Sequence, residues 1–177
     1  MAQTKNPKTE TFLKISHAVF QLEESQGHLR WKVTDLVRKV KLSRSLVYAY
    51  MGSSKKEILL SALRHFINDF YGFDDSKSPT SSAKQIQRAR ERIIHYPEAV
   101  IFYQKWRARE SWLQLEFAQI EKRFQQQIKD QHPTLTEIQI LGVHATIHGL
   151  VTAPFLTSQQ AEAIYKETVR RLCNQPQ

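Results

Sequence analysis

The sequence has little glycine, proline or cysteine, and these shortages narrow the possible folds. Its 177 residues include 5 Gly, 6 Pro and one Cys, Cys173. With so few chain breakers, and with many Leu, Gln, Glu, Lys, Arg and Ala residues, the composition favours an almost entirely helical protein. A single cysteine excludes a disulfide within the chain, which agrees with a reducing, cytoplasmic location.

The sequence also lacks the segments that mark several other classes of protein. No apolar run approaches the length of a membrane-spanning helix, and the start MAQTKNPKTE is too polar for a signal peptide. There is no nucleophile elbow, glycine-rich phosphate loop, HExxH motif or paired-cysteine motif. We therefore expect no enzyme, no membrane protein and no cofactor.

Positive charge is abundant and unevenly distributed. The formal net charge is +9. Residues 1–60 hold 11 Lys and Arg against 5 Asp and Glu, whereas residues 61–177 hold 15 against 12. Two thirds of the excess therefore lies in the first third of the chain, a distribution that indicates a polyanionic partner.

The basic first third contains a stretch, residues 33–60, that predicts two short helices followed by a long one. The spacing i, i+3, i+4, i+7 indicates one apolar helical face, formed by Val33, Leu36, Val37 and Val40. Lys41 and Leu42 are the expected turn, and Ser43 suits the N-cap of a helix from Arg44 to about Tyr50. Two short helices joined this tightly are the helix-turn-helix plan.

The second short helix has a predicted inner and outer face. Leu46 and Val47 should face the interior, and the residues expected to point outward are Arg44, Ser45, Tyr48 and Tyr50. After this helix, Ser54 and Glu57 form a capping box that opens a long apolar helix, predicted over residues 55–71.

This region resembles the DNA-binding domain of the tetracycline-repressor (TetR) family of bacterial regulators. The resemblance covers residues 12–60 and rests on the run Ser43-Arg44-Ser45-Leu46-Val47-Tyr48, on Tyr48-x-Tyr50-Met51-Gly52, on Ser54-Lys55-x-Glu57-Ile58-Leu59 and on Ile15-x-x-Ala18-Val19-x-x-Leu22-x(4)-Gly27. The remainder agrees in length and helical character. The resemblance implies that Arg44, Ser45, Tyr48 and Tyr50 face the major groove and its walls, with Lys32, Thr34 and Lys55 on phosphates.

The chain departs from the family pattern at several positions. The family usually has Gly at Lys41, a small residue at Val37, Thr at Lys32 and a large aromatic residue at Glu23, and the segment between Tyr50 and Ser54 is one residue longer here. A lysine at position 41 is strained if the turn needs a positive φ.

The rest of the chain predicts further helices. Outside the two short helices, the expected ranges are 9–26, 55–71, 82–95, 98–107, 110–130, 138–151 and 158–173. Gly27 should end the first helix, Trp31 should be a core wedge, and residues 72–79 read as a break. Thr134 or Thr136 should cap the eighth helix, with a capping box between Thr134 and Glu137, and Ser158 should cap the ninth. Arg88, Arg90 and Arg92 are expected on a solvated face.

Taken with the resemblance, this pattern predicts an all-α chain of about nine helices. Residues 1–53 are the expected helix-turn-helix domain, and residues 54–177 the expected ligand-binding and dimerisation domain, with the helix over 55–71 connecting the two. The helix over 138–151 is apolar all round, so it should be buried on most sides. The resemblance implies that it and the helix over 158–173 form a four-helix bundle with a second copy.

Two arguments, one from the sequence and one from the geometry of DNA, support a homodimer. Gly142 and Gly149 lie on roughly the same side of their helix and allow close approach. A dimer also places two recognition helices about a helical turn apart (~34–36 Å), which suits a palindromic operator on double-stranded DNA.

The resemblance further implies a pocket for a small apolar or aromatic effector. The candidate lining residues are Phe102, Tyr103, Trp106, Trp112, Phe117, His144 and His148. Aromatic residues at helical spacing are more often plain core. The i, i+4 spacing of His144 and His148 could hold a metal, but no carboxylate or cysteine sits beside them in sequence, so we expect none.

The sequence thus favours a DNA-binding transcriptional regulator, a repressor released from its operator by a small molecule. Two alternatives stay open. One is a DNA-binding regulator without a small-molecule ligand, and the other is a helical adaptor for a protein partner that has lost DNA recognition.

Overall fold

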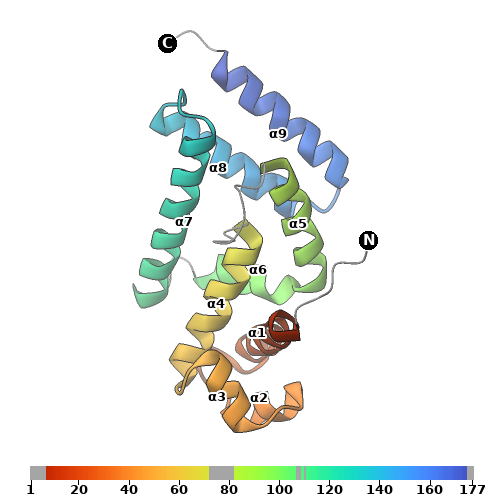
Figure 1. Ribbon diagram of the computed structural model, residues 1–177, viewed down its shortest axis with the longest axis vertical. Coiled ribbons are helices and arrows are strands. Elements are labelled where there is room, and N and C mark those ends of the chain that lie inside the picture. The colour runs from red at the N-terminus through yellow and green to blue at the C-terminus, as the bar shows by residue number, and fades with distance from the viewer. Residues whose placement is uncertain (1–6, 72–81, 107–108, 110, 175–177) are drawn as a thin grey trace. The chain divides into compact units, whose positions relative to one another are not determined.

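The computed structural model describes residues 7–71, 82–106, 109 and 111–174, and in these ranges every regular element is an α-helix (Figure 1). The helices are α1 (Pro7–Gln26), α2 (Val33–Val40), α3 (Arg44–Met51), α4 (Lys55–Tyr71), α5 (Ser82–His95), α6 (Pro97–Trp106), α7 (Ser111–Gln131), α8 (Glu137–Thr152) and α9 (Ser158–Cys173). The predicted all-α class is confirmed. The predicted break over residues 72–79 lies outside the described residues. None of the described helices has the length and apolar character required to cross a bilayer.

The chain divides by contacts into two compact units. The N-terminal unit comprises residues 1–69 and 96–105, and the C-terminal unit comprises residues 70–95 and 106–177. By contacts, therefore, most of α4 and nearly all of α6 group with the first three helices. The functional boundary between residues 53 and 54 stays a prediction.

The core of the N-terminal unit is built around α1. Trp31 is fully buried, so its predicted role as a core wedge is confirmed. The ring of Phe20 on α1 lies 5.7 Å from that of Phe66 on α4 and 5.4 Å from that of Phe102 on α6. Glu98, at the start of α6, accepts a hydrogen bond from Gln21 on α1. These contacts join α1, α4 and α6 in one core, and α2 and α3 pack on α1.

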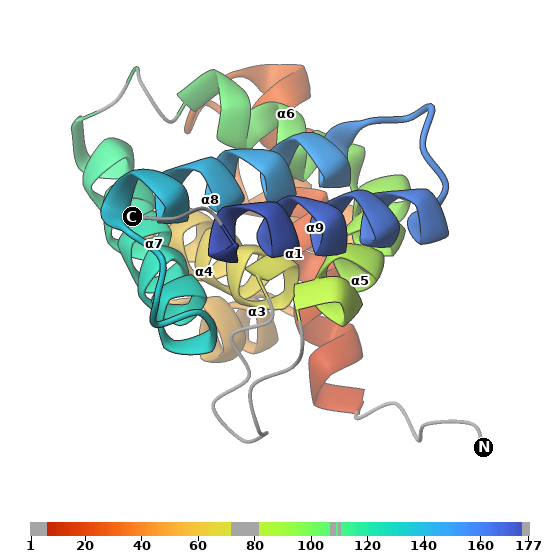
Figure 2. The same ribbon diagram turned by 90° about the horizontal axis from the view of Figure 1, so that it is seen from above.

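In the C-terminal unit, α5 packs on α8 and α9, and α7 packs on α8. Figure 2 shows α8 and α9 side by side, joined by a short connection and running in opposite directions. Arg90 of α5 donates hydrogen bonds to the carbonyl oxygens of Leu150 in the last turn of α8, of Ala153 at its C-cap and of Leu156 in the connection to α9. The prediction that Arg90 is solvated was wrong, because its guanidinium binds carbonyl oxygens where α8 ends and the helix supplies no further amide donors.

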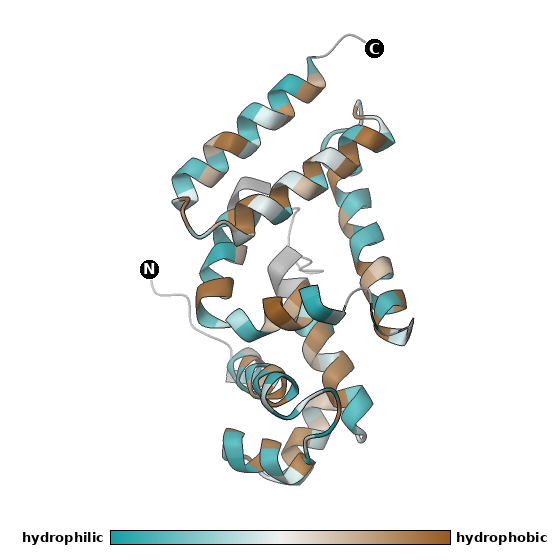
Figure 3. Cartoon of the chain, turned by 180° about the vertical axis from the view of Figure 1, so that it is seen from behind, coloured by the Kyte–Doolittle hydropathy of each residue, from teal (hydrophilic) through white to brown (hydrophobic). Residues whose placement is uncertain are grey.

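Helix α8 is only partly buried by its own chain. Six of its residues are buried, whereas Ile138 and Leu141 are 82% and 52% exposed, and Gly142, Ala145 and Gly149 are exposed too. Figure 3 shows apolar residues along the length of this helix. The prediction that α8 is buried on most sides was therefore wrong for the single chain, since α5, α7 and α9 cover only one face.

The caps of the last two helices differ in part from the prediction. Thr136, one of the two predicted candidates, caps α8: its hydroxyl accepts from the Gln139 amide, and the Gln139 side chain accepts from the Thr136 amide, so the predicted capping box between Thr134 and Glu137 was wrong. Thr157, not Ser158, caps α9 in the same reciprocal arrangement with Gln160. In both cases the residue with extended backbone conformation becomes the cap, and glutamine three residues later completes the box.

Candidate nucleic-acid interface

The turn between α2 and α3 has the predicted geometry. Lys41 adopts a left-handed conformation, with φ 54° and ψ 44°. The Ser43 hydroxyl accepts a hydrogen bond from the Leu46 amide at 3.2 Å, which confirms Ser43 as the N-cap of α3. At the other end, Gly52 has a φ of 106°, and its amide donates to the Tyr48 carbonyl oxygen. Helix α3 therefore begins and ends at fixed points of the N-terminal unit.

The inner face of α3 is formed by Val47 and Met51, which are both buried. Arg44 and Ser45 are exposed, as predicted. Leu46 is 37% exposed, so the prediction that it faces the interior was wrong. Successive residues of a helix are separated by about 100°, and the buried direction follows Val47 and Met51 rather than Leu46.

Arg44 and Tyr48 lie one turn apart on α3 and interact with each other. The Arg44 Nε donates to the Tyr48 hydroxyl at 2.9 Å, and the guanidinium lies 5.4 Å from the Tyr48 ring centroid. This contact uses one of the five N–H donors of the guanidinium. The pair is thus held in a defined orientation while the other donors remain able to bind a base edge or a phosphate.

Tyr50 lies differently from the prediction. It is half-buried, and its ring packs edge-on against Phe12 of α1 at a centroid distance of 5.6 Å. The ring therefore fastens the end of α3 to α1 rather than pointing freely outward.

The predicted phosphate-binding residues lie at two helix starts. Lys32 and Thr34 are exposed at the beginning of α2, where the Lys32 amide donates to the Asp35 carboxylate. Lys55 is half-buried at the beginning of α4, and its Nζ donates to the Leu29 carbonyl oxygen at 2.6 Å. Lys55 thus ties α4 to the connection between α1 and α2, while its ammonium keeps two more hydrogens.

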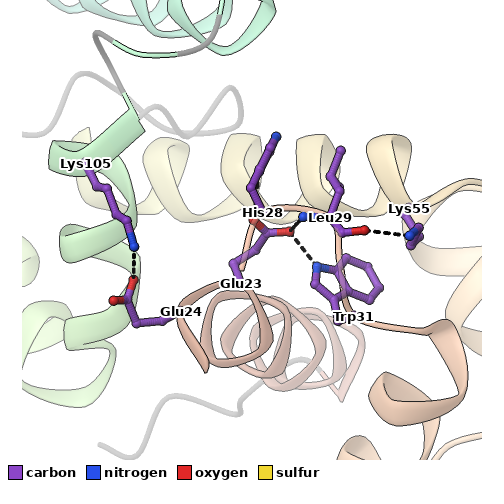
Figure 4. A network of polar contacts seen from close by, with 7 residues as sticks. All are labelled: Glu23, Glu24, His28, Leu29, Trp31, Lys55 and Lys105. Carbon is purple, nitrogen blue, oxygen red and sulfur yellow. Dashed lines mark hydrogen bonds and ion pairs between the residues drawn. The ribbon is translucent and has the colours of Figure 1, made fainter. Parts of the chain in front are cut away.

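A buried carboxylate organises that same connection (Figure 4). Glu23 of α1 is 1% exposed. Its Oε1 accepts from the Leu29 amide at 3.0 Å and from the Trp31 indole at 2.5 Å, and its Oε2 lies 2.8 Å from His28 Nδ1. In the sequence, Glu23 stands out only as a departure from the TetR-family pattern. The available signal was a charged residue at an otherwise apolar position, eight residues before a tryptophan whose indole needs an acceptor.

Exposed basic residues outnumber the acids around the helix-turn-helix. Glu23 is buried, and Asp35 and Glu57 bind backbone amides at helix starts. Hydrogen bonds from the Ser53 hydroxyl, and then from the Ser53 and Ser54 amides, lower the pKa of the Glu57 carboxyl. The exposed basic residues on the loop and on α2 and α3 are Arg30, Lys32, Arg38, Lys39, Lys41 and Arg44. This surface therefore favours a polyanion.

The predicted ligand-binding residues are divided between the two units. Phe102 and Tyr103 are buried in the N-terminal unit, and Phe102 packs on Phe20. The members in the C-terminal unit are Trp106, Trp112, Phe117, His144 and His148.

Within the C-terminal unit, the two histidines lie close together on α8. Their ring centroids are 4.9 Å apart, and His144 Nδ1 lies 3.2 Å from Gln125 Nε2 on α7. In the described part of the chain, no group of three or more His, Cys, Asp or Glu residues is arranged to hold a metal ion.

Comparison with known proteins shows a likeness in structure rather than in sequence. No protein-family model matches the chain, and no curated protein matches it. A solved structure described as a TetR-family transcriptional regulator from Rhodococcus sp. matches 96% of this chain and 100% of its own, with a TM-score of 0.62 and 13% identity. The TetR-family regulator PfmR from Thermus thermophilus matches with a TM-score of 0.49 and 12% identity, covering 100% of this chain and 99% of its own. The Rhodococcus likeness shows that the chain has the fold of a TetR-family regulator.

Proposed function

We propose that this protein is a sequence-specific DNA-binding transcriptional regulator. The observation that carries the proposal is α3, a short helix capped at both ends, whose Arg44 and Ser45 are exposed beside a row of basic residues on α2 and its turn. In a helix-turn-helix, the second helix enters the major groove, where all four base pairs can be distinguished. A cytoplasmic location follows for a protein that acts on a bacterial chromosome.

The contacts of the proposed complex follow from where the side chains lie. Arg44 donates to a guanine edge, and Ser45 and Tyr48 bind base edges or the groove wall. Lys32 and Thr34, exposed at the start of α2, bind phosphates. Tyr50 and Lys55 are fixed by Phe12 and Leu29, so their contacts are limited to a phosphate within reach of the tyrosine hydroxyl or the lysine ammonium.

We propose further that two copies pair through α8 and α9. The exposed apolar residues Ile138 and Leu141 on α8, together with Ile164 on α9, would be covered by the same face of a second copy. A Cβ added at Gly142 or Gly149 would meet nothing within 4 Å in the single chain, so both glycines leave room for a partner helix. A twofold interface of this kind uses one self-complementary patch on both copies.

The regulator is proposed to be a repressor that a small apolar or aromatic molecule releases from its operator. The aromatic side chains that support a site of this chemistry are Trp112 and His148 in the C-terminal unit, because both residues are only partly buried. A coupling free energy of about 1–3 kcal/mol would change operator affinity about 5- to 150-fold.

The DNA-binding proposal is tested by gel-shift titration of the full chain against DNA from its own promoter region. Arg44→Ala should weaken sequence-specific binding by roughly 1–3 kcal/mol, because a bidentate contact to guanine is lost. Tyr48→Ala should weaken it too. Arg123→Ala, which removes an exposed arginine from α7, is the matched control and should bind as the unchanged protein does. Equal binding by all four proteins, or no preference for any sequence, would refute the proposal.

The effector is tested separately, on the preformed complex with DNA. Aromatic compounds are added one by one, and release of the DNA is followed by fluorescence anisotropy. An effective compound should act less well on Trp112→Ala than on the unchanged protein. If no compound releases the DNA, the regulator acts without a small ligand of this class, and the DNA-binding proposal is unaffected.

A further inference from the structure

The outermost surface of α3 is short and largely apolar. Because an α-helix turns about 100° per residue, the direction opposite the buried Val47 and Met51 falls on Ala49. Ser45 and Leu46 lie on either side of that direction. All three residues are exposed. The centre of the proposed recognition surface therefore carries a methyl group, an isobutyl group and one hydroxyl.

The longer polar side chains of α3 lie on its flanks. Arg44 and Tyr48 share one flank and are joined by the hydrogen bond at 2.9 Å. Tyr50 lies on the other flank, where Phe12 holds it. The short side chains of Ser45 and Ala49 let the helix backbone approach the groove floor closely. Apart from the Ser45 hydroxyl, the groups nearest the base edges are then the hydrocarbon side chains of Leu46 and Ala49, which can neither donate nor accept a hydrogen bond.

The 5-methyl group of thymine is the only alkyl group on the major-groove edges of the base pairs. We propose that Leu46 and Ala49 recognise thymine methyl groups at the centre of each half-site, with Leu46 making the larger contact. This inference rests on the proposed DNA-binding function and specifies its base preference. It divides α3 into an apolar centre that selects thymine and a polar flank formed by Arg44 and Tyr48. This flank hydrogen-bonds to the base edge or the phosphate of the adjoining base pair.

Leu46 does not belong to the buried face of α3. The interior side of α3 is already filled by Val47 and Met51, which are 0% and 1% exposed, whereas Leu46 is 37% exposed. Alanine has a higher helix propensity than leucine, so Leu46→Ala should leave α3 intact. A change in DNA recognition by this variant therefore reports on contact with DNA rather than on folding.

The experiment replaces thymine by deoxyuridine, which removes the 5-methyl group and leaves every hydrogen-bonding group in place. A duplex that the full chain binds specifically is prepared with each thymine replaced in turn, and dissociation constants are measured by fluorescence anisotropy. We expect one or two positions per half-site at which each lost methyl weakens binding about fourfold. Leu46→Ala should bind the thymine duplex about as weakly as the unchanged protein binds the deoxyuridine duplex, and should show no further loss at that position.

Leu115→Ala is the matched control, because Leu115 is an exposed leucine on α7, 66% exposed. It should keep the full deoxyuridine penalty. Specific binding that is indifferent to deoxyuridine at every position, or a penalty that Leu46→Ala leaves unchanged, would overturn the inference while the proposed function stands. Failure of the unchanged protein to prefer any DNA sequence would overturn both.

Discussion

At the scale of single residues, Glu23 shows how a charge is accommodated inside the N-terminal unit. A buried carboxylate is costly unless hydrogen bonds replace the water that it loses. Here the Leu29 amide and the Trp31 indole donate to one oxygen, and His28 lies against the other. The carboxylate thereby fixes the connection that leads into α2, including Leu29, whose φ of 54° is unusual for a leucine.

We predict that position 23 needs an acceptor more than it needs a charge. In Glu23→Gln, the amide oxygen can keep both N–H donors and the amide nitrogen can donate to His28, so most of the stability should remain. Glu23→Ala leaves two buried donors unsatisfied and should lower the free energy of unfolding by about 3 kcal/mol. Urea denaturation measures both.

The neighbouring acid provides the control for this comparison. Glu24 faces solvent and forms an ion pair with Lys105 at 3.5 Å. Glu24→Ala should cost no more than about 1 kcal/mol, since exposed ion pairs contribute little. A cost at Glu23→Ala as small as that at Glu24→Ala would show that the Glu23 hydrogen bonds do not stabilise the connection.

His132, at the end of α7, should make stability fall on acidification. Burial lowers the pKa of its imidazole from the ordinary 6.5, so the folded chain binds a proton there less readily than the unfolded chain does. The stability that depends on neutral His132 is present above about pH 6.5 and is lost as the pH falls from there through the folded-state pKa. Denaturation between pH 7 and pH 5.5 should therefore show a smaller loss in His132→Gln than in the unchanged protein. His95→Gln, at an exposed histidine of the same unit, should lose as much stability as the unchanged protein does. If the free energy of unfolding fell equally with pH in the unchanged protein and in both variants, His132 would not be the group responsible.

At the scale of elements, the turn between α2 and α3 contains a strained backbone conformation at Lys41. Lys41 sits in the left-handed region, which a residue with a Cβ occupies at roughly 1–2 kcal/mol above glycine. We predict that Lys41→Gly raises the free energy of unfolding by about 1 kcal/mol despite the greater freedom of the unfolded chain. Lys39→Gly, two residues earlier and inside α2, removes the same charge but should lower stability by about 1 kcal/mol. Thermal unfolding of the two variants should show that Lys41→Gly gains stability and Lys39→Gly loses it. A loss of stability in both variants would show that Lys41 is not strained.

The elements that could be predicted from the sequence are those fixed by neighbouring residues. Ser43 caps α3 and Ser54 with Glu57 opens α4 as expected, because the partners in each motif are only three residues apart and no other residue nearby competes for the same role. Thr134 and Thr136 both fit a cap by composition, and only the backbone conformation decides between them. Arg90 could not be predicted, since its carbonyl partners lie at least 60 residues away in the chain.

The candidate site was predictable to a similar degree. Arg44 and Ser45 are exposed as the helix-turn-helix pattern predicts, because arginine and serine side chains on a short helix are mostly exposed. Leu46 and Tyr50 were misplaced because α3 has only eight residues, too few for apolar periodicity to define a face. Which side is buried depends instead on α1, through contacts such as that between Tyr50 and Phe12. The buried role of Glu23 likewise depends on a loop that periodicity does not describe.

At the scale of the whole molecule, the exposed face of α8 is the feature that a single chain leaves unexplained. A fully exposed leucine or isoleucine on its own is ordinary for a protein surface. The exposed residues Ile138, Leu141, Gly142, Ala145 and Gly149 instead recur on one side of one helix, and Ile164 is exposed on α9, which packs against α8. The two glycines are unfavourable in a helix by about 1 kcal/mol each relative to alanine, a cost that close approach of a partner helix would offset.

We predict that Gly142→Leu separates the stability of the chain from its assembly. The added side chain meets open space in the single chain, so it should not disturb folding, and leucine should favour the helix more than glycine does. In a dimer built on this face it would hold the two α8 helices apart. Sedimentation equilibrium should therefore give a dimer for the unchanged protein and a monomer for Gly142→Leu, with unchanged helical circular dichroism.

Leu141→Glu should also give a monomer, and Leu115→Glu, at the exposed leucine of α7, should remain dimeric. Because one recognition helix reads too few base pairs, the monomeric variants should lose their preference for a palindrome over a half-site. A dimer that survives both α8 substitutions would place the contact between copies on another surface.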